Sequence, residues 1–151
     1  MAARKTLNNA LTGMAGTYFV AAELSRRGYV ALLTLRNTRG IDILVSKEDP
    51  TKSVGIQAKA SNSGQDWLLD EKAETDPPEK LFYVFVRLNG LGAPAFYIVP
   101  GGVVAKYVRD GNQAWLATPG RGGRPHKANR MRNFRDRENQ YRDRWESLGL
   151  D

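Results

Sequence analysis

Three short apolar runs follow one another closely in the first part of the chain, at residues 29–35, 41–46 and 53–60. Turn-forming residues separate them, at positions 37–40 and around Pro50. Apolar runs of this length between turn signals are typical of β-strands, and strands joined by short turns pair as antiparallel neighbours. The sequence therefore predicts a β-meander as the first part of a sheet.

The segments around this meander predict the rest of an α/β fold. A helix is expected over residues 6–27, ended by Gly28, with Gly13 and Gly16 permitting a close approach of another element. Two more strands are expected at 81–86 and 95–99, then a short helix at 103–108 and a short strand at 114–116. Residues 61–80 are largely polar and are expected to be irregular. The apolar stripe of the first helix consists of Leu7, Leu11, Met14, Tyr18 and Ala21.

The C-terminal part of the chain is basic and rich in glycine. Residues 118–125 predict a flexible loop, and residues 129–148 predict a charged helix with a sparse apolar stripe. We expect one domain over residues 1–151, with a core at about 7–110 and a basic loop and helix at 118–148. The predicted architecture is a mixed β-sheet flanked by helices, with a basic C-terminal helix.

Composition excludes several kinds of chemistry. The chain has no cysteine and one histidine, which excludes disulfides, thiolate zinc sites, cysteine nucleophiles and multi-histidine metal sites. Carboxylates, lysine, hydroxyls and an oxygen-bound cation such as Mg²⁺ remain. The net charge of +7 favours polyanionic partners. No apolar run reaches a membrane span and no signal peptide is recognised, so we expect a cytoplasmic protein without membrane association; a homodimer is left open.

The strongest candidate for chemistry is a polar set on two neighbouring strands. Asp42 lies among large aliphatic residues, where an isolated carboxylate is costly. On the next predicted strand, alternation places Gln57 and Lys59 on one face. Carboxylate and amide oxygens suit Mg²⁺, and a lysine ammonium can hold a phosphate oxygen or a water. The alternative is a salt bridge between Asp42 and Lys59 at the rim of the sheet, with Gln57 a satisfied polar residue.

These residues carry a resemblance to a known group of enzymes. The segment GIDILV at 40–45, followed by Gln57-Ala58-Lys59, resembles the motif of the PD-(D/E)XK nuclease superfamily, which has a restriction-endonuclease-like fold. Residues 13–29 resemble the first helix of small bacterial members, and residues 82–86 and 96–100 resemble their later strands. The resemblance implies a Mg²⁺- or Mn²⁺-dependent endonuclease that acts on DNA in repair, restriction or a mobile element. It implies that Asp42 and Gln57 ligate the metal and that Lys59 assists the hydrolytic water.

The chain departs from the motif at two positions. Gln57 stands where an acid is usual, although some nucleases of this group also use Gln-x-Lys. Thr17 stands where related small nucleases carry a glutamate on the first helix. Glu23 is therefore a further catalytic candidate, although its direction on the helix differs by roughly 120°. Its alternative is a residue that is solvated or paired with the neighbouring arginines.

Residues 121–135 begin within the glycine-rich loop, contain no acid, and are the candidate surface for nucleic acid. An exposed loop without any ligand is the alternative. The basic residues of the segment are Arg121, Arg124, Lys127, Arg130, Arg132 and Arg135.

Two rival functions also remain. One is a nuclease-fold protein that binds nucleic acid or a partner without cleaving, and the other is an α/β protein whose resemblance is accidental.

Overall fold

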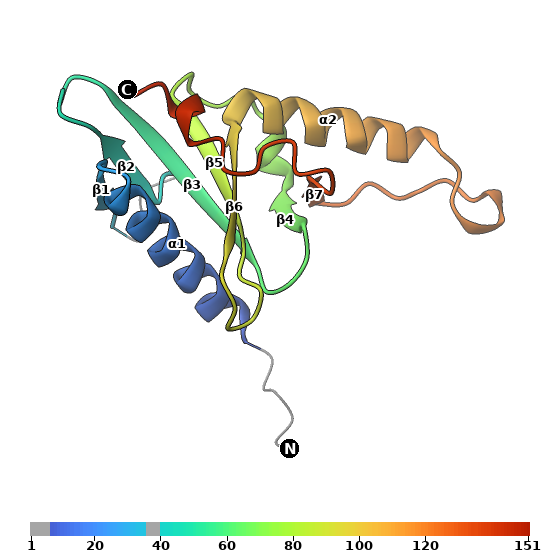
Figure 1. The fold of residues 1–151 in the computed structure, drawn as a ribbon. Helices are drawn as coiled ribbons and strands as arrows, with labels where there is room; N and C mark the ends of the chain where they lie inside the picture. The colour runs from blue at the N-terminus through green and yellow to red at the C-terminus, as the bar shows by residue number, and fades with distance from the viewer. Residues whose placement is uncertain (1–6, 36–39) are drawn as a thin grey trace, which may run out of the picture.

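The computed structural model describes residues 7–35 and 40–151. Thr6, at the start of the predicted helix, and most of the turn predicted at 37–40 lie outside the described residues. The main sheet is five-stranded and mixed, because β3 and β5 are parallel and the other neighbours are antiparallel (Figure 1). Its strands are, in spatial order, β1 (Val30–Leu33), β2 (Ile43–Ser46), β3 (Ser53–Ser61), β5 (Leu81–Arg87) and β6 (Ala95–Pro100). The predicted meander and the two later strands are confirmed.

Helix α1 (Asn9–Arg26) covers one face of this sheet, but not with the predicted stripe. Its buried residues are Thr12, Gly16, Val20 and Leu24, whereas the predicted core residues Leu11, Met14 and Tyr18 are exposed. Val20 and Leu24 pack against aliphatic residues of the main sheet. The predicted core face of this helix is therefore wrong.

A close contact between helix and sheet explains which face of α1 is buried. A Cβ atom at Gly16 would lie 2.5 Å from the Cβ atom of Ala60 on β3. Only glycine leaves space for the helix at this distance, so the face that carries Gly16 turns toward the sheet. Gly13 lies on another face and has no atom within 4 Å of such a Cβ position. The expected close approach is confirmed at Gly16 alone.

The other face of the main sheet is covered by a smaller sheet and by α2. Strands β4 (Asp66–Asp70) and β7 (Met131–Arg135) pair antiparallel, and a short 3-10 helix, η1 (Glu71–Glu74), follows β4. The region 61–80 is thus more regular than predicted. Aromatic rings fill this second core: Trp67 and Phe134 both pack on Phe85, and the Nε1–H group of Trp67 donates to the carbonyl of Val86.

Helix α2 (Gly101–Ala117) is longer than the helix predicted at 103–108. It includes residues 114–116, so the strand predicted there is wrong. The helix extends beyond the sheets and leads into a loop that returns toward β7, with a 3-10 turn, η2, at Arg121–Gly123 (Figure 1). Only the first part of α2 is buried, at Gly101, Val104, Ala105 and Val108.

The predicted basic C-terminal helix is also wrong. Its residues form β7, an irregular segment and a 3-10 helix, η3 (Trp145–Leu148). Burial in β7 alternates, with Arg132 and Phe134 inside, because pairing with β4 outweighs the weak helical pattern. The segment after β7 lies along β6: the N–H group of Ile98 donates to Tyr141 and that of Asp143 donates to Phe96.

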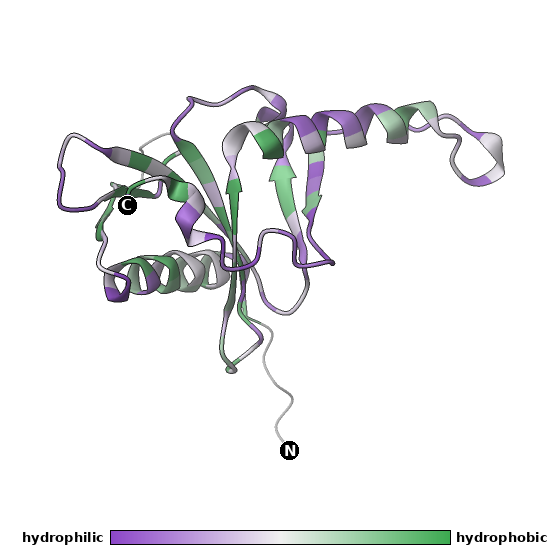
Figure 2. Ribbon diagram, turned by 45° about the horizontal axis from the view of Figure 1, so that its top comes forward, coloured by the Kyte–Doolittle hydropathy of each residue, from purple (hydrophilic) through white to green (hydrophobic). Residues whose placement is uncertain are grey.

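Apolar residues concentrate on the strands of the main sheet, as the hydropathy colouring shows (Figure 2). Two buried clusters result, one between the sheet and α1 and one between the sheet, β4, β7 and α2. Within the described ranges, no helix has both the length and the apolar character needed to cross a membrane.

The contact at Gly16 makes a prediction about stability. Gly16→Ala places a methyl group against Ala60, so we expect a net loss of about 1–2 kcal/mol in the free energy of unfolding, after the gain in helix propensity. Gly13→Ala is the matched control, and it should stabilise the protein by up to about 1 kcal/mol because its methyl group meets no neighbour. Urea denaturation measures both. Equal changes for the two variants would contradict the packing described here.

Candidate active site

Asp42 lies immediately before the first residue of β2. The neighbouring strand β3 extends beyond this point and has no β2 residue beside it there. Its backbone is held on both sides: its N–H group donates to the carbonyl of Ile56 at 2.7 Å, and its own carbonyl accepts from Thr34 at 3.0 Å. Its carboxylate Oδ2 accepts a hydrogen bond from the N–H group of Ala58 at 2.8 Å. The half-buried carboxylate is thus fixed to β3, between the positions of Gln57 and Lys59.

The structure brings the three predicted residues to one place. Asp42, Gln57 and Lys59 all line a single open pocket of about 810 Å³. No ion pair joins Asp42 to Lys59, so the salt-bridge alternative does not describe this rim of the sheet. Within residues 7–35 and 40–151, the Lys59 ammonium forms no ion pair or hydrogen bond, and the side-chain bonds of Asp42 involve Oδ2 only. Both groups therefore have capacity to bind a ligand.

The opposite wall of the pocket is formed by α1. Asn9, Gly13 and Thr17 line it, and the Thr17 hydroxyl donates to the carbonyl of Gly13 at 3.1 Å. The helix thus offers the amide of Asn9 and the hydroxyl of Thr17 on the side where the nuclease motif has a glutamate. Sequence reasoning had singled out Thr17 only as a departure, and Asn9 not at all.

Glu23 is not among the residues that line this pocket. Its Oε1 atom accepts from Nε of Arg27 at 3.0 Å, and its Oε2 atom lies 3.5 Å from Nε of Arg26. The Arg27 guanidinium in turn lies 5.0 Å from the ring centre of Trp145. Glu23 is therefore part of a structural cluster at the C-terminal end of α1, as its alternative interpretation proposed.

The donor atoms of the pocket suit a hard cation better than a soft one. They are a carboxylate from Asp42 and an amide oxygen from Gln57, with no sulfur or imidazole, which is the chemistry that Mg²⁺ prefers. The carbonyl of Ala58 adds a third oxygen, because a strand residue turns its N–H and C=O groups to the same side and this N–H group bonds Asp42. Among the described residues, no group of three or more acidic, histidine or cysteine side chains gathers to hold a metal. The residues fit Mg²⁺, but with little negative charge.

The predicted basic segment divides into two halves with different surroundings. Arg121, Arg124 and Lys127 are exposed on the loop after α2, and none of them forms an ion pair within the described ranges. His126, in the same loop, stacks on Trp115 with the ring centres 4.1 Å apart. The loop therefore presents unpaired positive charge around an aromatic pair.

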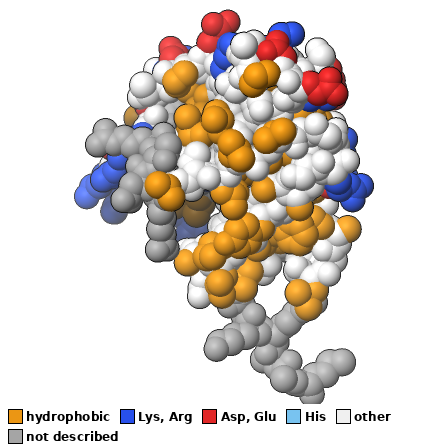
Figure 3. Space-filling view, turned by 90° about the vertical axis from the view of Figure 1, so that its left-hand side faces the viewer, with side chains coloured by type: hydrophobic (Ala, Val, Ile, Leu, Met, Phe, Trp, Pro, Cys, Tyr) orange, Lys and Arg blue, Asp and Glu red, His pale blue; other side chains and the backbone are white. Residues whose placement is uncertain are grey.

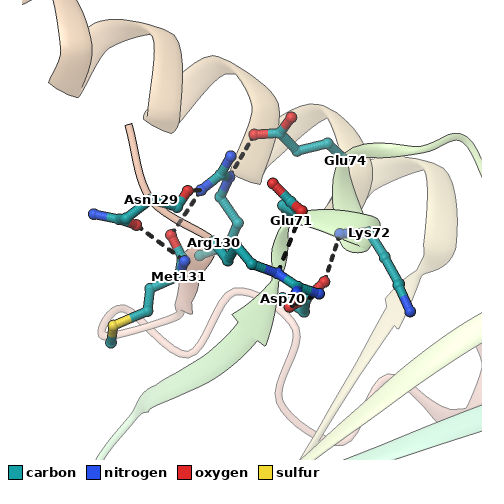
Figure 4. A network of polar contacts seen from close by, with 8 residues as sticks. Asp70, Glu71, Lys72, Glu74, Asn129, Arg130 and Met131 are labelled. Atoms are coloured by element: carbon teal, nitrogen blue, oxygen red, sulfur yellow. Dashed lines mark hydrogen bonds and ion pairs between the residues drawn. The ribbon is translucent and has the colours of Figure 1, made fainter. Parts of the chain in front are cut away.

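The second half of the segment pairs with acids of β4 and η1 (Figure 4). Arg130 lies 3.3 Å from both Asp70 and Glu71, and the nearly buried Arg132 bonds Glu74. The N–H group of Lys72 and the nearby Arg130 hold the pKa of Asp70 below its usual value. Arg135 likewise lies 3.4 Å from Asp66. These arginines tie β7 to β4, and much of their charge is already neutralised.

The fold of this chain is similar to that of a known protein, although its sequence is not. No protein-family model and no curated protein sequence matches the chain. Among solved structures, the chain is similar to a bacterial homing endonuclease, I-Ssp6803I, with a TM-score of 0.56 and 14% sequence identity. The match covers 96% of this chain and 93% of that chain. This chain therefore shares its overall fold with a homing endonuclease.

Proposed function

We propose that this protein is a Mg²⁺-dependent nuclease of the PD-(D/E)XK type that hydrolyses phosphodiester bonds in DNA. One observation carries the proposal: Asp42, Gln57 and Lys59 line one pocket, at the end of β2, within a fold shared with a homing endonuclease. The residues of the motif are separated in sequence, and their meeting in one pocket is what a catalytic role requires.

The role proposed for Asp42 follows from its hydrogen bond. Ala58 N–H holds Oδ2, which fixes the carboxylate and leaves Oδ1 for a cation. The Gln57 amide oxygen and the Ala58 carbonyl would complete the protein ligands on β3. When bound, Mg²⁺ supplies stabilisation for the negative charge that develops on the phosphoryl oxygens. Gln57 adds no charge of its own, so Asp42 carries the electrostatic attraction for the ion.

The role proposed for Lys59 follows from its lack of a partner. Lys59 is half-buried and lines the pocket, and its ammonium is not neutralised by an acid among the described residues. It can therefore donate a hydrogen bond to a phosphate oxygen or to the water that attacks phosphorus. In hydrolysis, the water oxygen forms a bond to phosphorus while the bond to the leaving nucleotide oxygen breaks, and Lys59 would hold one of these oxygens in place.

A second candidate function is binding of nucleic acid without cleavage. The observation that favours it is the low charge of the pocket, where Thr17 and Gln57 stand in place of acids and the described residues gather no group of three metal-binding side chains. On this alternative the fold and the basic loop persist, but no cation binds tightly enough for hydrolysis. Cleavage assays separate the two functions.

The loop after α2 is the part of the basic segment that we propose for contact with phosphates. Arg121, Arg124 and Lys127 are exposed and form no ion pair with an acid among the described residues, so each can neutralise a phosphate and release the counterions condensed on the nucleic acid. Arg130 and the arginines of β7 are less suited, because they already pair with acids. These acids are Asp66, Asp70, Glu71 and Glu74.

Substitution in the pocket tests the catalytic proposal. Asp42→Asn and Lys59→Ala should each reduce the rate of Mg²⁺-dependent plasmid nicking by at least about 100-fold, because each removes a charge that acts on the reacting phosphate. Glu23→Gln is the control on the same domain and should keep the wild-type rate, since Glu23 does not line the pocket. Circular dichroism would show that the variants remain folded. Nicking that persists in Asp42→Asn, or an absence of nicking in the wild type with intact DNA binding, would favour the binding module.

The salt dependence of DNA affinity tests the division of the basic segment. Replacing Arg121, Arg124 and Lys127 by alanine should flatten the slope of log K against log salt for duplex DNA by up to about 2.7, because about 0.9 is lost per phosphate contact. The control is Arg130→Ala with Arg135→Ala, which removes paired charges and should change the slope by less than about one. Fluorescence anisotropy at several salt concentrations measures both. A larger effect in the control would place the DNA contact on β7 instead.

A further inference from the structure

The two edges of the main sheet are treated differently by the fold. On the β6 side, the segment after β7 covers the edge through hydrogen bonds of Ile98 with Tyr141 and of Asp143 with Phe96. On the β1 side, no strand of residues 7–35 or 40–151 pairs with the outer side of β1. A strand edge of this kind offers unpaired N–H and C=O groups to another strand.

The backbone groups that β1 turns outward can be assigned. Thr34 donates to Asp42 and Leu32 lies opposite Leu44, so the groups of Leu32 and Thr34 point toward β2. Because direction alternates along a strand, the N–H and C=O groups of Ala31 and Leu33 point away from it. These two residues stand symmetrically on either side of Leu32.

The side chains of β1 lack the features that normally protect an edge. Residues 29–35 contain no charged residue and no proline. Val30 is 50% exposed, Leu32 is 58% exposed and Leu33 is 50% exposed. Leu44, on β2 beside Leu32, is exposed as well. Natural edge strands usually carry lysine, proline or a bulge against unwanted pairing, so an apolar edge without them indicates a partner.

A space-filling view shows the wider surface around this edge. Hydrophobic side chains gather across the side of the molecule that carries β1 and α1, with charged side chains mainly at its margins (Figure 3). Met14 and Tyr18, from the exposed stripe of α1, line the same pocket as Leu33 of β1. The loop after α2, which carries exposed basic residues, lies at the other end of the molecule (Figure 1). If two copies meet at β1, their basic loops are far apart, and the repulsion between these loops would be screened by salt.

We infer that β1 pairs antiparallel with β1 of a second copy of this chain and joins the two five-stranded sheets into one. A second copy fits because the outward groups are symmetric about Leu32: Ala31 of one copy would exchange hydrogen bonds with Leu33 of the other. Leu32 would then face its own counterpart in a non-hydrogen-bonded pair, where side chains approach closely. An isologous contact of this kind closes as a dimer and does not propagate.

The pairing also has a consequence for the pocket. Leu33 and Leu35 line the pocket that holds Asp42 and Lys59, so both pockets would lie beside the twofold axis. The axis of two antiparallel strands is perpendicular to their sheet, which puts both pockets on the same face. The dimer itself does not depend on the proposed nuclease function, because it rests on the sheet edge alone.

Mass measurement in solution tests the inference first. The chain has a mass of 16.8 kDa, and light scattering during size exclusion should report twice this value for the wild type at micromolar concentration. Leu32→Lys should halve the measured mass, because it sets two like charges opposite each other on the axis. Leu91→Lys is the control, since Leu91 is an 89% exposed leucine in the turn between β5 and β6. A wild type that stays monomeric would overturn the inference and leave the edge for a strand of a different protein.

A disulfide cross-link tests which surface forms the dimer. The chain has no cysteine, so a single substitution reports on one contact. In a non-hydrogen-bonded antiparallel pair the Cα atoms are about 4.5 Å apart, which a disulfide can bridge. Under mild oxidation, Leu32→Cys should form a covalent dimer, whereas Leu91→Cys should not. A dimeric wild type in which Leu32→Cys cross-links no faster than Leu91→Cys would place the interface elsewhere and overturn the inference. Neither outcome depends on whether the protein cleaves DNA.

Discussion

The hydrogen bond from Ala58 N–H to the carboxylate of Asp42 is the contact on which the candidate site depends. Strand β2 begins just after Asp42. The N–H group of Ala58 on β3 therefore lies beyond the paired part of β2 and has no backbone acceptor there. The carboxylate of Asp42 accepts this hydrogen bond and so takes the place of a backbone carbonyl. This satisfies a backbone donor and also directs an acid into the pocket beside Gln57 and Lys59.

Strand β3 connects this site to the rest of the molecule. Its Gln57 and Lys59 line the pocket, its Ala60 receives Gly16 of α1, and its other neighbour is the buried strand β5. The strands that hold the site are packed against α1 on one face, while the basic loop extends from the far end of α2. The pocket and the separate, exposed loop that we propose for phosphate contact would together suit the proposed enzyme, which acts on a long polyanion.

Most features that depend on a local sequence pattern could be predicted from the sequence. Features that depend on contacts between residues far apart in the sequence could not. The strands and the meeting of Asp42, Gln57 and Lys59 followed from alternation and turn residues. The buried face of α1 did not, because the space for Gly16 is set by Ala60, which is far away in sequence. Arg130, Arg132 and Arg135 were predicted to contact phosphates because residues 121–135 contain no acid. Their partners come from β4 and η1, which reach them only when the two strands pair.

Binding of Mn²⁺ by calorimetry tests the central claim most directly, because it examines the pocket apart from any substrate. We expect one ion per chain, with an affinity that falls at least about tenfold in Asp42→Ala, because removing even a residue that only orients a ligand costs about 10–100-fold. Gln57→Glu should bind the ion more tightly than the wild type, because a second carboxylate would face it, and Glu23→Gln should bind like the wild type. Equal affinities in all four proteins would contradict a metal site formed by Asp42 and Gln57.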